Sequence, residues 1–341
     1  MMLYYNGLER QAAMRICIYG AGAIGGYVGV LLARGGADVS LIARGPHLAA
    51  IRQNGLTVRF KDHEQCAWLP ASDDAAEFGP QDYVIVALKA HQAWQAAEKL
   101  QPLLGRETAV VTMQNGIPWW YFYGLKGQYE NHRLSSVDPG DRQWNAITPE
   151  RVIGATVYQA AEIIEPGVIK HTYGDKLGLG EPSGEETART TTLTEVLNAG
   201  GIRARQHKDI RSDIWLKLWG NLCFNPISAL THATLDVVAT DPGTRRIARL
   251  MMSEAETIGR SLGAEFRVDI TRRIDGAAGV GAHKTSMLQD LEKGRTIELD
   301  ALLTVVQEMG TLTGVATPVI DMVLALTQQM GRIAGVYPAY Q

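Results

Sequence analysis

Short runs of apolar residues recur between residues 15 and 204, and the stretches between them have helical spacing. Residues 83–88 are apolar without a break, which is typical of a parallel strand buried on both faces. Strands that alternate with helices predict an α/β domain built on a parallel sheet. A Pro-Gly pair at 166–167 predicts a hairpin turn. The expected strands are residues 15–19, 39–43, 56–60, 82–88, 109–113, 152–157, 177–179 and 202–204.

The pattern changes at Asp209, where the strand signals fade and apolar residues recur at helical spacing. We place a domain boundary near residues 206–208, which gives an α/β domain at 14–206 and an all-helical domain at 207–341. Met14 stands directly before the first strand. The pattern therefore leaves open whether residues 1–13 belong to the native product.

The first strand runs into a glycine-rich turn that opens a helix. Gly20, Gly22 and Gly25 have the spacing G-x-G-x-x-G of dinucleotide-binding domains. The first glycine allows the tight turn, the second lets a pyrophosphate approach the backbone, and the third lets helix and strand pack closely. Ala23 and Ile24 lie in the same turn, where free helix N–H groups attract phosphate. The alternative is a glycine turn that binds nothing.

The end of the second strand indicates which nicotinamide cofactor is preferred. An acidic residue there binds the ribose hydroxyls of NAD. Here the chain reads Ala-Arg-Gly at 43–45, and Asp38 comes too early, before the strand. We therefore expect NADP, with Arg44 at its 2′-phosphate, unless Arg44 is a solvated surface residue.

Two further polar residues follow buried strands. Lys89 comes after residues 82–88 and Asn115 after residues 109–113. Ligands of open α/β sheets bind at the carboxyl ends of the strands. We expect both residues near the cofactor; the alternatives are a surface lysine and a turn asparagine.

A polar stripe marks the first predicted helix of the second domain. Lys217, Asn221 and Asn225 lie four residues apart, so a helix puts them on one face. Burying a lysine and two asparagines without partners would be costly. The stripe favours a functional cleft over its alternative, an exposed helix face. Large apolar residues surround it: Trp215, Leu216, Leu218, Trp219, Leu222 and Phe224.

A second polar segment lies at residues 284–300. Ser286 and Gln289 have the spacing of a capping box, which predicts that Ser286 caps a helix. Gly294 interrupts the helical pattern. Thr296 is placed to cap the next helix, with Glu298 in its first turn, where the helix dipole favours a carboxylate.

Composition argues against several partners. The net charge of −3 gives no sign of nucleic-acid binding, and no apolar run is long enough to span a bilayer. The scattered cysteines Cys17, Cys66 and Cys223 are interpreted as small buried hydrophobes in a reducing compartment, the cytoplasm. We expect no metal, because Cys-x-x-Cys and His-Glu-x-x-His motifs are absent.

The aromatic run at 119–123 is interpreted as core, with a pocket wall or partner surface as alternatives.

Five motifs together resemble the ketopantoate reductase (2-dehydropantoate 2-reductase) family, and their order and spacing match from Met14 to about residue 335. The resemblance implies a Rossmann domain, a helical domain and an active site in the cleft between them. The motifs are Gly-Ala-Gly-Ala-Ile-Gly at 20–25, Leu-Lys-Ala-His-Gln at 88–92, Gln-Asn-Gly at 114–116, Lys-x3-Asn-x3-Asn-Pro at 217–226, and Ser-Met-Leu-Gln-Asp at 286–290 with Gly-Arg-Thr-Ile-Glu at 294–298.

The resemblance also implies a reaction, the reduction of the ketone of 2-dehydropantoate by NADPH to give pantoate for coenzyme A synthesis. Lys217 matches the catalytic lysine, whose ammonium would stabilise the developing alkoxide and supply the proton. Glu298 matches the acid that accepts from the far hydroxyl of the substrate.

The resemblance implies binding roles for five more residues. Ser286 matches a serine that contacts the substrate carboxylate, and Asn221 and Asn225 match asparagines that line the substrate site. Asn115 and Lys89 match groups near the nicotinamide half of the cleft.

Two segments depart from the family pattern. Residues 227–236 lack the further substrate-site asparagine of many members, and residues 119–142 are longer and more aromatic. Two alternatives therefore stay open: an NADPH-dependent reductase of another branched 2-oxo acid, or a non-catalytic NADP-binding sensor. The aromatic run and the apolar carboxyl-terminal helices are the surfaces through which a homodimer could form.

Overall fold

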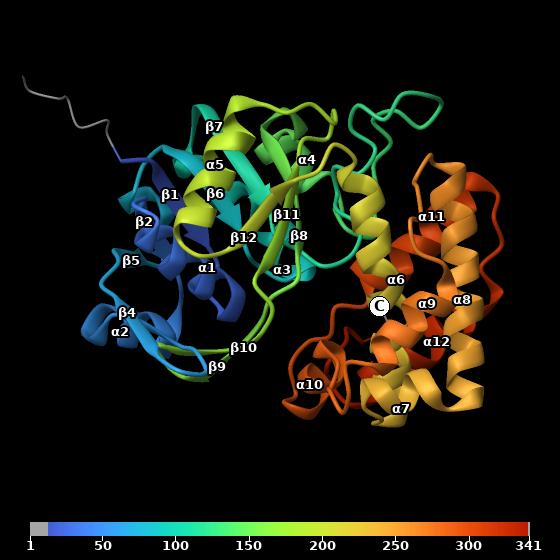
Figure 1. Ribbon diagram of the computed structural model, residues 1–341. Coiled ribbons are helices and arrows are strands. Elements are labelled where there is room, and N and C mark those ends of the chain that lie inside the picture. Colours follow the sequence, from blue (N-terminus) through green and yellow to red (C-terminus); the bar gives the residue numbers. More distant parts are fainter. Residues whose placement is uncertain (1–12, 340–341) are drawn as a thin grey trace, which may run out of the picture.

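The computed structural model describes residues 13–339. Our expectation for the start of the chain falls mostly on residues 1–12, which lie outside the described residues. A sheet-containing part at the left of Figure 1 is followed by a helical part at the right. The described chain therefore confirms the expected fold class, an α/β dinucleotide-binding architecture followed by helices.

Strands and helices are mixed up to Gln206, with β3 to β5 and β8 to β11 in direct succession, and only helices follow within the described residues. The strands are β1 (Arg15–Tyr19), β2 (Asp38–Ile42), β3 (Leu56–Arg59), β4 (Glu64–Ala67), β5 (Ala71–Ser72), β6 (Gln81–Val86), β7 (Leu104–Thr112), β8 (Val152–Val157), β9 (Ala160–Glu165), β10 (Val168–Tyr173), β11 (Lys176–Gly180) and β12 (Arg203–Gln206). The helices are α1 (Ala23–Arg34), α2 (Gly45–Asn54), α3 (Ala90–Ala96), α4 (Arg142–Ile147), α5 (Ala188–Ala199), α6 (Ile210–Thr231), α7 (Leu235–Thr240), α8 (Pro242–Ser261), α9 (Ile270–Ala278), α10 (Ser286–Glu292), α11 (Val305–Thr313) and α12 (Pro318–Ile333).

The large sheet has the strand order β12-β11-β8-β7-β6-β1-β2-β5. Its pairs are parallel except β8 with β11. The register pairs Tyr19 with Ile42 on one side and with Val86 on the other, and Val86 pairs with Thr112. The carboxyl ends of these four strands therefore share one edge, which is where sites form in open α/β sheets.

A second, smaller sheet has the order β4-β3-β10-β9. Helix α1 packs between the two sheets, and its glycines make the close approach possible. A Cβ on Gly26 would lie 2.4 Å from Ile169 Cδ1 of the small sheet. A Cβ on Gly29 would lie 3.0 Å from Leu41 Cδ2 of the large sheet.

Several details differ from the sequence expectations. Residues 56–60 contribute β3, as expected, but β3 pairs in the second sheet. Strands β4 and β5 and helix α4 were not anticipated, because the mostly exposed Glu64–Ala67 strand lacks a clear apolar period. Cys66 is exposed, so our interpretation of all three cysteines as buried holds only for Cys17 and Cys223.

The helical part is organised around α6. Asp209 caps this helix by accepting a hydrogen bond from the Ser212 N–H at 3.0 Å, because a carboxylate satisfies the free N–H groups of the first turn. Helices α7, α8, α10 and α12 pack around α6, and the amino-terminal part of α6 also packs on β8 and β11. Helix α6 thus carries its side chains to the junction of the two parts.

The aromatic run lies in the core. Trp119 through Phe122 are buried, and only Tyr123 is partly exposed. The Trp120 indole donates to Thr112 Oγ1 at 2.9 Å, and the Trp215 indole donates to Tyr121 Oη at 2.7 Å. The core interpretation is confirmed, and the four buried residues are not available as a partner surface.

Candidate active site

A cavity of about 500 Å³ opens at the carboxyl ends of β1 and β2. The glycine turn lines this cavity together with residues of α3 and of the 3₁₀ helix that follows it. Its lining includes Tyr19, Gly20, Ala21, Gly22, Ile42, Ala43, Arg44, His47, Asp73, Leu88, Gln92, Gln95, Ala96 and Lys99.

The three motif glycines meet different constraints. Gly20 has a φ of +102°, which few other residues adopt. A Cβ on Gly25 would lie only 2.2 Å from the Gly20 carbonyl oxygen, whereas a Cβ on Gly22 would meet nothing within 4 Å. Gly22 is also the cap residue of α1, and no side chain caps this helix. The N–H groups of the first turn, which begins at Ala23 and Ile24, are therefore free for an anion.

Arg44 follows β2 and is the cap residue of α2. It is exposed and lines the cavity together with Lys99 and Asp73. No acid stands at the end of β2, as the sequence indicated. Lys99 was not anticipated, because its place on the cavity wall follows from the packing of the turn after α3.

Lys217 and Asn115 meet across the junction of the two parts. The Lys217 ammonium donates to Asn115 Oδ1 at 2.7 Å, although 102 residues separate them. The Tyr158 ring also lies near this ammonium, with its centroid 5.9 Å from Lys217 Nζ. The structure therefore brings the lysine of the helix stripe to the sheet edge that the sequence predicted.

Burial lowers the pKa of Lys217 to about 8, and the Glu298 carboxylate partly opposes this effect. Burial also raises the pKa of Glu298. The Ala90 N–H, which donates to Glu298 Oε1 at 3.1 Å, and a hydrogen bond with Asn115 act in the opposite direction. Asn115 therefore links the two titratable groups of the site.

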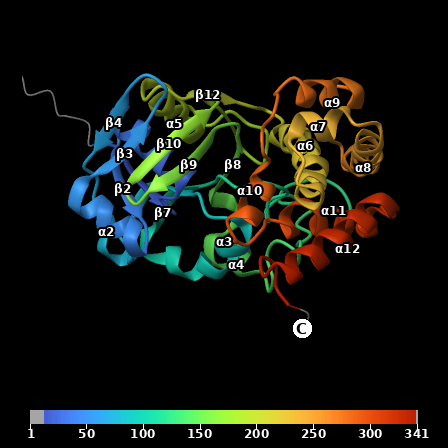
Figure 2. The same ribbon diagram turned by 90° about the horizontal axis from the view of Figure 1, so that it is seen from below.

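Lys89 lies at the amino end of α3 but points to the helical part. Its ammonium donates to Asp290 Oδ2 at 2.6 Å and to the Thr296 carbonyl oxygen at 2.9 Å. Asp290 is buried and also accepts from Arg295 Nε at 2.9 Å. Figure 2 shows α10, which carries Asp290, at the junction between β9 and α6. We call Lys89, Asp290 and Arg295 the interdomain latch.

The rest of the stripe faces α10. Asn225 is buried, and its Nδ2 donates to Ser286 Oγ at 3.4 Å. Asn221 is half-buried, and its side chain makes no hydrogen bond with any residue from 13 to 339. The stripe is therefore neither an exposed helix face nor a fully paired one.

Two local predictions for residues 284–300 are wrong. Thr285 caps α10 by accepting from the Leu288 N–H at 3.3 Å, and Ser286 is the first helical residue. Glu298 precedes a π-helical turn at Asp300–Thr304 and lies in no first turn of its own. Its carboxylate instead meets the amino end of α3, which the helix dipole still favours.

Sequence reasoning missed two residues beside Lys217. Tyr158 directly follows β8, so the rule that placed Lys89 and Asn115 could have indicated it too. Arg273 on α9 approaches α6 at Gly220. No periodicity or motif could have placed Arg273 there, because the approach depends on how α9 packs in the helical part.

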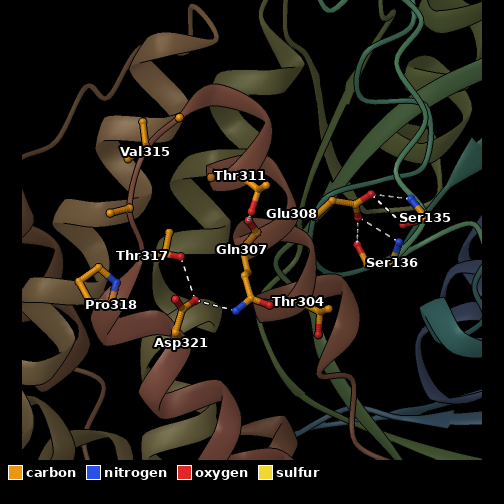
Figure 3. Close-up of a pocket in the computed structure, with 13 residues that line it drawn as sticks. Ser135, Ser136, Thr304, Gln307, Glu308, Thr311, Val315, Thr317, Pro318 and Asp321 are labelled. Atoms are coloured by element: carbon orange, nitrogen blue, oxygen red, sulfur yellow. Dashed lines mark hydrogen bonds between the residues drawn. The ribbon is translucent and has the colours of Figure 1, made fainter. Parts of the chain in front are cut away.

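A larger cavity of about 760 Å³ lies elsewhere, between α11 and the start of α12 (Figure 3). None of the sequence-predicted site residues lines it. Its carboxylates are occupied: Glu308 accepts from the N–H groups of Ser135 and Ser136 at 2.8 and 3.0 Å, and Asp321 accepts from Gln307 and Thr317 at 2.7 and 2.9 Å. These bonds fasten loops to the helices and α11 to α12, so the cavity is not the candidate site.

Residues 13–339 contain no group of three or more histidine, cysteine, aspartate or glutamate side chains arranged to hold a metal ion. In the same range, no helix combines the length and the apolar character that a membrane span requires.

Comparisons with known proteins agree with this architecture. The family model described as "Ketopantoate reductase PanE/ApbA" matches residues 16–184, and the model of its C terminal matches residues 209–331. A "2-dehydropantoate 2-reductase" of Mesorhizobium japonicum is 54% identical over 309 residues, which cover 90% of this chain and 95% of that protein.

Solved structures share the fold. A protein of Ralstonia solanacearum MolK2 superimposes with a TM-score of 0.91 at 38% identity, covering 96% of this chain and 100% of the other. A D-mandelate dehydrogenase solved with NADH and anilino(oxo)acetate gives a TM-score of 0.81, covering 95% and 100% of the two chains. Its 23% identity makes this likeness one of fold alone.

Proposed function

The chain belongs to the ketopantoate reductase family, whose members are oxidoreductases, and we propose that it is a 2-dehydropantoate 2-reductase. In this proposal it reduces the ketone of 2-dehydropantoate with NADPH and releases pantoate for coenzyme A synthesis. The observation that carries the proposal is the Lys217 ammonium, 2.7 Å from Asn115 at the sheet edge beside the dinucleotide cavity. A cation at this point is what a ketone needs when it becomes an alkoxide.

The cavity beside β1 and β2 would hold NADP. Gly20, Gly22 and Gly25 would shape the turn around the pyrophosphate, and the N–H groups at Ala23 and Ile24 would donate to it. The open space at Gly22 and the uncapped start of α1 support this assignment. When bound, NADPH supplies the hydride.

Arg44 would bind the 2′-phosphate that distinguishes NADP from NAD. Its exposure, its place on the cavity wall and the lack of an acid at the end of β2 support this role. Lys89 and Asn115 are proposed to line the part of the site that holds the nicotinamide. Lys89 would do so from within the interdomain latch, and Asn115 while it holds Lys217.

Lys217 is proposed to bind the carbonyl oxygen of the substrate and to deliver the proton. The ammonium stabilises the negative charge that develops on this oxygen, and proton transfer to the oxygen completes the alcohol. A pKa of about 8 supports this role, because the best proton donors have a pKa near the working pH. Asn115 fixes the direction of Nζ by accepting one of its hydrogen bonds.

The remaining residues would position the substrate. Glu298 is proposed to accept from the hydroxyl at the far end of 2-dehydropantoate. Asn221, Asn225 and Ser286 are proposed to line the site, with Ser286 at the carboxylate. The Asn221 amide, which has no partner in the described part of the chain, and the contact between Asn225 and Ser286 support this placement.

Steady-state kinetics with a panel of 2-oxo acids tests the proposal. We expect the highest kcat/KM for 2-dehydropantoate with NADPH. A kcat/KM at least tenfold higher for another branched 2-oxo acid would make the chain a reductase of that acid. Tight NADPH binding without turnover of any 2-oxo acid would instead identify a non-catalytic sensor.

The location and assembly of the protein are also proposals. Cys17, Cys66 and Cys223 are free, which supports a reducing compartment, the cytoplasm.

Exposed apolar residues on α12 support a homodimer, namely Met322, Leu326 and Ile333. Light scattering would then report twice the chain mass of 37.2 kDa.

A further inference from the structure

Arg273 carries a positive charge that nothing in the described chain neutralises. It is half-buried on α9, and its Nε is shielded from solvent without a hydrogen-bond partner. Its guanidinium forms no hydrogen bond or ion pair with any residue from 13 to 339. Leaving a charged group partly desolvated and unpaired costs free energy, so a native example needs an explanation.

The guanidinium lies against the helix of the polar stripe. A Cβ on Gly220 would come within 2.4 Å of Arg273 Nη2, so a side chain at this position would push the guanidinium away from α6. Gly220 follows Lys217 by three residues, which puts both positions on neighbouring parts of one helix face, about 4.5 Å apart along the axis. Arg273 therefore approaches α6 within one turn of Lys217.

The charges around this point explain why Arg273 has no partner among residues 13–339. Asp213 is the acid one turn before Lys217, and it is engaged by His207 Nδ1. Burial raises the pKa of Tyr158, whose ring faces Lys217, while the positive charge of Arg273 opposes that rise. Tyr158 thus lies near two cations, Lys217 and Arg273.

We propose that Arg273 binds the carboxylate of the 2-oxo acid, an inference that rests on the proposed function. A serine hydroxyl such as that of Ser286 can donate one hydrogen bond but cannot balance the charge of a carboxylate. A guanidinium does both, with two parallel N–H groups. With Arg273 on the carboxylate, Lys217 stays free for the ketone oxygen.

Two substitutions test this role by different routes. Arg273→Gln removes the charge. Gly220→Ala keeps the arginine but places a methyl group 2.4 Å from its Nη2, which displaces the guanidinium, and alanine in a helix favours folding over glycine. For both variants we expect a KM for 2-dehydropantoate 10- to 100-fold higher, with less than a tenfold change in kcat and an unchanged KM for NADPH. Arg273→Lys should recover part of the loss.

The matched control is Arg272→Gln, which removes the exposed arginine next to Arg273 on the same helix and should leave all constants unchanged. A second comparison uses the methyl ester of the substrate, which lacks the carboxylate charge. The ester should be reduced about equally well by the wild-type protein and by Arg273→Gln. Equal KM values for the acid in Arg272→Gln and Arg273→Gln would overturn the proposal. A weaker affinity of Arg273→Gln for NADPH with an unchanged KM for the acid would overturn it too.

Binding measurements separate this inference from the proposed function. Oxamate has the carboxylate and carbonyl of a 2-oxo acid but is not reduced, and its binding to the NADP-loaded protein can be followed by calorimetry. Weaker oxamate binding to Arg273→Gln than to Arg272→Gln supports the carboxylate role even if no 2-oxo acid is turned over. Turnover of 2-dehydropantoate with equal oxamate binding in both variants leaves the proposed function standing and overturns the role of Arg273.

Discussion

Lys217 is the residue on which the proposed chemistry depends, so its removal is the most direct test. Lys217→Ala should lower kcat by about 10²–10⁴-fold, the usual contribution of general acid catalysis. NADPH affinity should stay nearly unchanged, because Lys217 does not line the dinucleotide cavity. Lys208→Ala, at an exposed lysine just before α6, is the control. A near-normal kcat in Lys217→Ala would show that Lys217 does not deliver the proton.

The lowered pKa of Lys217 predicts a pH dependence. A lysine is charged below its pKa, so kcat should fall as the pH rises through about 8. Burial of the ammonium is the main reason why this loss comes below the ordinary lysine value of 10.5. A pH profile of kcat at saturating substrate measures it. Activity that persists undiminished up to the ordinary value would show that another group delivers the proton.

Arg44 should decide the preference for NADPH over NADH. Arg44→Ala should weaken NADPH binding by about 1.5–3 kcal/mol, or about 10- to 100-fold, because it loses a charge-assisted phosphate contact. NADH binding should change little, since NADH has no 2′-phosphate. Fluorescence titrations with both cofactors give the two constants. Equal losses for both would mean that Arg44 does not bind the phosphate.

At the scale of elements, the glycine turn offers a matched pair of substitutions. In Gly25→Ala the new Cβ would lie 2.2 Å from the Gly20 carbonyl oxygen, so we expect a loss of about 1–3 kcal/mol in the free energy of unfolding. In Gly22→Ala the Cβ meets open space. We expect that variant to fold normally but to bind NADPH at least tenfold more weakly, because the methyl group occupies the path of the pyrophosphate.

Thermal unfolding and cofactor titration of both variants separate the two effects. Normal NADPH affinity in a stably folded Gly22→Ala protein would place the pyrophosphate elsewhere. A fully stable Gly25→Ala protein would mean that α1 can shift away from the turn.

The sequence predicts elements well where one local pattern decides them. The continuous apolar run before Lys89 indeed forms the buried strand β6, and the Pro166-Gly167 pair turns the β9–β10 hairpin. The apolar pattern does not predict which strands pair with one another. Nothing in residues 56–60 says that β3 joins β10, more than one hundred positions away, in a separate sheet. The prediction of Ser286 as the cap of α10 is wrong for a local reason: Thr285 and Ser286 are adjacent, and both residue types are good caps.

At the scale of the whole molecule, the site depends on contacts between distant parts of the chain. Motifs and strand ends indicated Lys217, Asn115 and Glu298 one by one. Their mutual arrangement could not be read from the sequence, since Lys217 and Asn115 are 102 positions apart. The interdomain latch is more remote still, because Lys89 and Asp290 are 201 positions apart. Arg273 was missed for the same reason.

The latch should contribute to stability. Asp290→Ala removes the buried carboxylate from Lys89 and Arg295, both of which keep some contact with water. We therefore expect a loss of about 1–2 kcal/mol in the free energy of unfolding, less than for a fully buried pair. Urea unfolding measures this loss. Glu107→Ala, at an almost fully exposed ion pair, should change stability very little, and equal effects of the two substitutions would contradict the latch.

The buried aromatic run has a consequence for how the chain is made. The ribosome delivers Trp119 through Phe122 well before Trp215, which follows Tyr121 by 94 positions. At about 5–20 residues per second, Tyr121 waits roughly 5–20 s for Trp215, the indole that bonds its hydroxyl and packs edge-on against its ring. A nascent chain in that interval exposes an apolar surface that chaperones bind. Synthesis that stalls before α6 would therefore yield an aggregation-prone fragment, not an independently folded nucleotide-binding domain.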